Sequence, residues 1–74
     1  MCKIKVNVFH KACKAVILAQ GTDAYAKAHA QVGLGVWDAY NIALQCVYLL
    51  HNVSGWTGKT ARQCRAVFRR YSQD

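Results

Sequence analysis

The chain has 74 residues, of which 54% are apolar and none is proline. This length allows one domain with a modest core, because so short a chain buries only about 60% of its unfolded surface, and the composition excludes a disordered protein. Ten lysines and arginines stand against three acidic residues, a formal net charge of +7. Such an excess favours a polyanionic partner. We therefore expect residues 1–74 to form a single small basic domain.

The N-terminal segment is too often interrupted by charge to be a signal peptide. Its lysines are Lys3, Lys5, Lys11 and Lys14, and they break every apolar stretch long enough for a signal-peptide core. We therefore predict a cytoplasmic protein whose four cysteines are reduced thiols, two of them in the core. Residues 39–58 carry no formal charge, but their polar side chains make a membrane span an unfavourable interpretation.

Glycines divide the chain into four segments, the first of which combines two patterns. Apolar and polar residues alternate up to Val8, as in a strand, whereas the apolar residues from Phe9 recur at helical spacing. Because the chain offers no obvious second strand, we predict a helix from about Asn7, with the residues before it free to be extended. Lys11 and Lys14 would lie on its outward face.

The second segment is rich in alanine and opens with Thr22 and Asp23, which are good N-cap residues. We predict a closely packed helix that ends at Gly33–Gly35, where glycine supplies the backbone freedom of a C-cap. The predicted inner stripe consists of Tyr25, Ala28 and Val32.

The third segment, residues 36–52, is apolar nearly all round. One side carries Trp37, Tyr40, Leu44, Val47 and Tyr48, and another carries Ala39, Ala43, Cys46 and Leu50. A helix with so little polar surface is normally the most buried one in its domain. We therefore expect it to be central, and Leu44→Ala or Val47→Ala to destabilise the protein by about 2–4 kcal/mol.

The fourth segment has the clearest amphipathic pattern, with Thr57 as the expected cap and an end near Tyr71. Its inward stripe consists of Thr60, Ala61, Cys64, Val67, Phe68 and Tyr71, which follow helical spacing. Together the four segments predict an all-α fold, a small single-domain bundle of three to four helices.

Motifs for chemistry are incomplete in this sequence. Gly58-Lys59-Thr60 has the form of the end of a phosphate-binding loop, but Val53 stands where that loop needs its first glycine and no strand precedes it. His10 and Cys13 are one helical turn apart, yet no second pair completes a zinc site. We therefore predict no metal, no cofactor and no small-molecule substrate. Enzymatic activity is not expected either, because the chain is short and has only two internal carboxylates.

The basic face of the fourth segment carries the functional prediction. Arginine binds phosphate or carboxylate with two hydrogen bonds, and three acids cannot pair with ten cations. The predicted binding residues are Lys59, Arg62, Arg65, Arg69 and Arg70, helped by Lys11 and Lys14. Arg62, Arg65 and Arg69 would form one ridge.

Two functions fit this ridge, and a protein that binds a membrane surface through the apolar third segment and the basic ends is a weaker third alternative. The first is a regulatory protein that contacts nucleic-acid phosphates, either without sequence preference or through a helix-turn-helix with residues 57–65 as recognition helix. The second is an inhibitor or adaptor, comparable in size and charge to small phage proteins, that binds an acidic surface of a host nucleic-acid-handling complex. The sequence does not distinguish DNA, RNA and protein as the partner, and it leaves the oligomeric state open.

Overall fold

The computed structural model describes residues 4–72, and these residues form four helices and no strand. The helices are α1 (Val6–Leu18), α2 (Ala24–Leu34), α3 (Ala39–Asn52) and α4 (Lys59–Ser72). The predicted all-α bundle is confirmed. Lys5, at the N-cap of α1, has extended backbone angles, as predicted for the residues before the first helix, while that prediction for residues 1–3 lies outside the described part of the chain.

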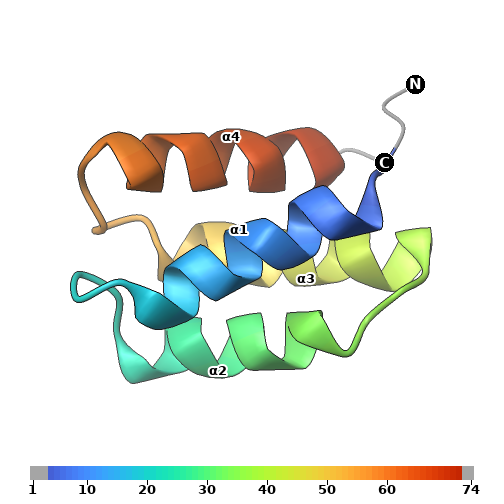
Figure 1. Ribbon diagram of the computed structural model, residues 1–74, viewed down its shortest axis with the longest axis horizontal. Coiled ribbons are helices and arrows are strands. Elements are labelled where there is room, and N and C mark those ends of the chain that lie inside the picture. The colour runs from blue at the N-terminus through green and yellow to red at the C-terminus, as the bar shows by residue number, and fades with distance from the viewer. Residues whose placement is uncertain (1–3, 73–74) are drawn as a thin grey trace.

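The four helices form a ring in which each packs on its neighbours (Figure 1). α1 packs on α2 and α4, α3 packs on the same two helices, and α1 and α3 contact each other little. In this ring each helix turns one face inward and leaves the opposite face to solvent. The start of α1 and the end of α4 lie close together, and the Lys5 N–H donates to the Tyr71 hydroxyl over 3.3 Å.

The core is built from large side chains of α1, α3 and α4 and small ones of α2. Phe9 and Phe68 are fully buried, with their ring centroids 6.3 Å apart in an edge-to-face arrangement. Ile42 and Leu49 of α3 are equally buried. Since fully burying such a side chain contributes about 1.5–3 kcal/mol, these residues stabilise the bundle most.

The predicted inner stripe of α2 is wrong. Tyr25 and Val32 are 73% and 54% exposed, and the buried residues of α2 are Ala26, Ala30 and Gly33. Small residues face inward because α2 lies very close to α1: a Cβ on Gly33 would be 2.8 Å from Cys13 Sγ. The helix begins as predicted, with Asp23 Oδ1 accepting from the Ala26 N–H over 2.8 Å.

α2 ends at Leu34, within the predicted Gly33–Gly35, but not through the backbone freedom that the prediction assumed. Gly33 is a buried helical residue, and the C-cap is Gly35, whose φ of −97° lies outside the left-handed region. Neither glycine is needed for a positive φ. Gly33 is required for close packing, which local sequence patterns do not reveal.

The prediction that α3 is the central helix is wrong as well. Its buried residues are Ile42, Cys46 and Leu49, whereas Leu44 and Val47 are 40% and 38% exposed. A helix in a ring of four buries only the face that it turns to the others. Because α3 is apolar on two sides, its pattern did not determine which side that would be.

The turn between α3 and α4 is held by buried side chains. Val53 and Trp56 are 1% and 7% exposed, and Gly21 of the α1–α2 turn lies against the Trp56 ring. α4 then begins at Lys59, where the Gly58 carbonyl accepts from the Arg62 N–H over 3.1 Å. Gly58, with φ of 111°, therefore takes the cap position that the sequence assigned to Thr57.

Candidate partner-binding surface

α4 presents the predicted cations because its buried and charged residues fall on opposite faces. Ala61, Cys64, Phe68 and Tyr71 are buried. The exposed cations of α4 are Lys59, Arg62, Arg69 and Arg70. Helical spacing alone places them together along the outer face of the bundle.

Three of these cations carry charge that the described part of the chain does not neutralise. Among residues 4–72, the side chains of Lys59, Arg62 and Arg69 make no hydrogen bond or ion pair. The two described carboxylates serve as N-caps instead: Asp23 accepts from Ala26, and Asp38 accepts from the Asn41 N–H over 3.0 Å. The Asn41 side-chain amide also donates to Asp38 and lowers the pKa of that carboxyl.

Arg65 has a different position from the other members of the predicted ridge. Its side chain is half-buried, and Nη1 donates to the Val53 carbonyl over 3.1 Å and to the Trp56 carbonyl. It therefore fixes the α3–α4 turn, and replacing it with glutamate would disturb the fold. Lys27 has a similar structural position, because its Nζ donates to the Ala19 carbonyl at the end of α1 over 2.6 Å.

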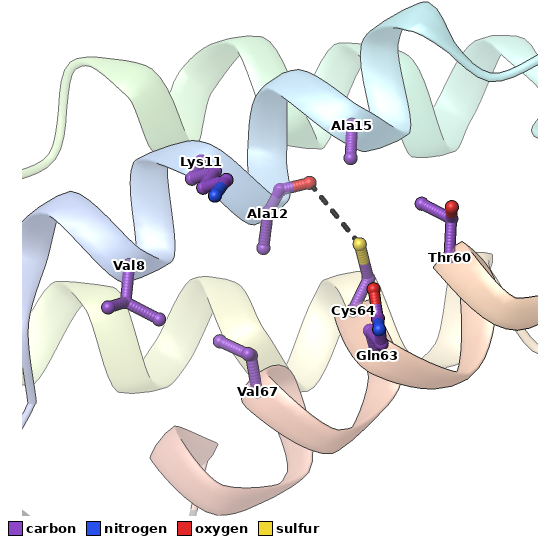
Figure 2. Close-up of a pocket in the computed structure, with 8 residues that line it drawn as sticks. All are labelled: Val8, Lys11, Ala12, Ala15, Thr60, Gln63, Cys64 and Val67. Carbon is purple, nitrogen blue, oxygen red and sulfur yellow. Dashed lines mark hydrogen bonds between the residues drawn. The ribbon is translucent and has the colours of Figure 1, made fainter.

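Lys11 and Lys14 are both exposed on α1, as predicted, and Lys11 approaches α4. It lies at the rim of an apolar hollow of about 200 Å³ between the two helices. Figure 2 shows the residues that line this hollow: Val8, Lys11, Ala12 and Ala15 of α1, and Thr60, Gln63, Cys64 and Val67 of α4. The hollow is smaller than usual ligand sites of about 300–1,000 Å³, and two of its lining residues already contact each other, since the Cys64 Sγ–H donates weakly to the Ala12 carbonyl over 3.8 Å.

A second, wider hollow lies on the other side of α4, against α3. It has a volume of about 610 Å³, and its lining residues are Val47, Leu50, His51, Ser54, Arg65, Arg69 and Ser72. Its α3 side is mainly apolar, and its α4 side is cationic. Arg69 therefore borders both the basic face and the exposed side of α3.

The exposed side of α3 is a surface feature that the sequence reasoning placed in the core. Tyr40 is 77% exposed and Tyr48 is 43% exposed, with Leu44 and Val47 between them. Trp37, just before α3, is 69% exposed and meets the His10 ring edge-on at 4.6 Å. The sequence did contain a signal for this exposed side. The segment is apolar on two sides, and a helix in so small a bundle cannot bury both.

His10 and Cys13 do not share a metal position. The His10 Nε2–H donates to the Val36 carbonyl over 2.9 Å, whereas Cys13 is fully buried in the core. Within residues 4–72, no group of three or more His, Cys, Asp or Glu side chains is arranged to hold a metal ion.

The described thiols are Cys13, Cys46 and Cys64, all buried. Burial raises the pKa of Cys13 and of Cys46 to about 12, and it raises the pKa of Cys64 as well. A nucleophilic cysteine reacts as its thiolate and therefore needs a lowered pKa. These thiols are packing groups of the core.

The raised thiol pKa values predict that the protein loses stability in alkaline solution. Above the ordinary pKa of 9.0 the unfolded chain releases thiol protons that the folded chain keeps up to about pH 12, so the free energy of unfolding falls as pH rises. Each such thiol adds a slope of about 1.4 kcal/mol per pH unit. Urea unfolding at about pH 8 and about pH 10 should show a smaller loss for Cys46→Ala than for the wild type. An equal loss would contradict the burial argument.

The sequence also suggested two alternatives, a membrane-spanning helix and a helix-turn-helix. No helix in residues 4–72 is long and apolar enough to cross a bilayer. α3 and α4 run in opposite directions along the long axis of the molecule (Figure 1), whereas the helices of a helix-turn-helix cross steeply.

Comparisons of the chain with protein-family models, curated proteins and solved structures found no match.

Proposed function

We propose that this protein is a non-enzymatic regulatory protein that binds nucleic acid, with the exposed cations of α4 contacting the phosphates. The observation that carries the proposal is the group Lys59, Arg62 and Arg69, which share the outer part of one helix and have no carboxylate partner in residues 4–72. Unpaired surface cations bind a polyanion by releasing its condensed counterions. A helix face provides the phosphate contacts without any special scaffold.

Some of the ten cations of the chain are not assigned to direct contacts with the nucleic acid. Arg65 and Lys27 donate to backbone carbonyls and hold turns, so their charge contributes to the surrounding field rather than to direct contacts. Lys11 and Lys14 of α1 are exposed and contribute secondary contacts. The buried thiols, whose pKa values are raised, are unsuited to act as nucleophiles, and this supports a binding function rather than a catalytic one.

A pair of matched double variants tests this assignment. Arg62→Gln with Arg69→Gln and Lys11→Gln with Lys14→Gln each remove two positive charges from exposed positions. Because a hydrogen bond to a charged group contributes about 1.5–3 kcal/mol, the α4 pair should weaken nucleic-acid binding at least about tenfold more than the α1 pair. Binding is measured by fluorescence anisotropy at low salt, and circular dichroism checks that both variants fold.

The outcomes separate the alternatives. Equal losses in the two double variants would mean that net charge alone drives binding and that α4 holds no site. Absence of binding to DNA and RNA at low salt would overturn the proposal and leave an acidic protein surface as the partner class that the charge favours.

A further inference from the structure

We infer that the bound nucleic acid is single-stranded, and that its bases stack on the aromatic side chains exposed on α3 while its phosphates follow the arginines of α4. This inference rests on the proposed function and extends it, because it names the form of nucleic acid and a second set of contact residues.

The first observation is the exposure of aromatic rings on a regular helix. Tyr40 and Tyr48 lie two turns apart on α3, on the side opposite the buried Ile42 and Leu49, and Leu44 continues the surface between them. Large apolar side chains that are exposed together on one face are typical of binding sites. Tyrosine suits such a site because its ring is rigid and loses little entropy on binding.

The second observation is that the aromatic surface extends across two helices. The Tyr48 ring is stacked on the His29 ring of α2, with centroids 5.3 Å apart and an interplanar angle of 24°. Tyr25, one turn before His29 on α2, is 73% exposed. The stack orients the Tyr48 ring against α2, so α2 and α3 together contribute aromatic rings to this surface.

The third observation places cations along the edge of this aromatic surface. Val47 and His51 of α3 line the same open hollow as the exposed Arg69 of α4. His51 lies three residues after Tyr48, which makes the two side chains neighbours on the helix surface, so the hollow lies between the aromatic surface and α4. Rings for the bases and cations for the phosphates therefore lie side by side.

This combination selects a single strand among the occupants that the surface could take. A duplex hides the faces of its bases and offers mainly phosphates to a helix, whereas a single strand exposes base faces that stack on aromatic side chains. A second copy of this chain would bring another +7 of charge to a surface already bordered by arginines. A strand of alternating flat bases and negative phosphates complements both parts of the surface.

The test compares oligo-dT and oligo-rU of about 20 nucleotides with a duplex of similar length, by fluorescence anisotropy at low salt. The single strands should bind more tightly than the duplex. Tyr40→Ala and Tyr48→Ala should each weaken single-strand binding about fivefold or more, the range for loss of one stacked base, whereas Tyr40→Phe, which keeps the ring, should retain binding. Leu18→Ala is the matched control, since Leu18 is 82% exposed on α1 and should have no effect.

The salt dependence distinguishes the two sets of contacts. The tyrosine variants should keep the wild-type slope of log K against log salt, because they lose no phosphate contact. Equal binding of duplex and single strand, with Tyr40→Ala and Tyr48→Ala unchanged in affinity, would overturn this inference and leave the proposed function standing. Absence of any nucleic-acid binding at low salt would overturn both.

Discussion

Phe68→Ala should destabilise the protein by about 3–5 kcal/mol, which in a domain of this size is enough to unfold most of the population. Phe68 is fully buried on the inner face of α4, and its ring meets Phe9 of α1 edge-to-face at 6.3 Å. Truncation removes this contact and leaves a cavity where α1 and α4 meet. Urea unfolding followed by circular dichroism measures the loss.

The control comes from α3, where the structure reverses the expectation drawn from the sequence. Leu49→Ala should cost about 2–5 kcal/mol because Leu49 is fully buried, whereas Leu44→Ala and Val47→Ala, at 40% and 38% exposure, should each cost less than about 1 kcal/mol. If Leu44→Ala destabilised the protein as much as Leu49→Ala, the assignment of Leu44 to the exposed face of α3 would be contradicted.

Gly33→Val should be comparably destabilising, by about 3 kcal/mol. A Cβ at this position would lie 2.8 Å from Cys13 Sγ and 3.0 Å from Phe9 Cζ, and both of those side chains are fully buried. Neither can move without disturbing the core, and an overpacked core typically loses about 1–3 kcal/mol, with more at tight sites. Valine also has a lower helix propensity than most residues.

Gly35→Ala is the matched control for this substitution, two residues further along the chain. A Cβ at Gly35 would meet only the Val32 carbonyl, at an ordinary 3.6 Å, and its φ is negative. Thermal unfolding should therefore give a melting temperature close to that of the wild type for Gly35→Ala and a much lower one for Gly33→Val. Similar values for the two variants would show that α1 and α2 do not pack as closely as described.

The sequence predicted the helices well and the orientation of two of them poorly. α4 has one apolar stripe and one charged face, so its pattern leaves a single way to bury it, and Phe68 and Tyr71 lie inside as predicted. α3 has two apolar sides, and only the ring arrangement of the helices decides that Ile42 faces inward and Tyr40 outward.

For α2, residue size decided the orientation. Burying Tyr25 would bury more apolar surface, but Ala30 and Gly33 are small enough to allow the close approach of α2 to α1. Such a contact depends on a partner distant in the sequence, and local patterns contain no information about it.

The candidate site, too, could be predicted only in part from the sequence. Helical spacing brings Arg62, Arg65 and Arg69 to one side of α4, but only Arg62 and Arg69 are exposed there, and Arg65 is half-buried. The separate position of Arg65 depends on the Val53 and Trp56 carbonyls of the preceding turn, whose directions follow from the folded backbone. The aromatic surface could be recognised only after the orientation of α3 was known.

The most direct test of the proposed function is the salt dependence of nucleic-acid affinity for the wild type and for the Arg62→Gln, Arg69→Gln double variant. We predict that log K for the wild type falls linearly with log salt, and that the slope of the double variant is smaller by about 1.4 for a single strand, since each lost phosphate contact contributes about 0.7. A wild-type affinity that does not change with salt, or identical slopes for the two proteins, would contradict the assignment of these arginines to phosphate contacts.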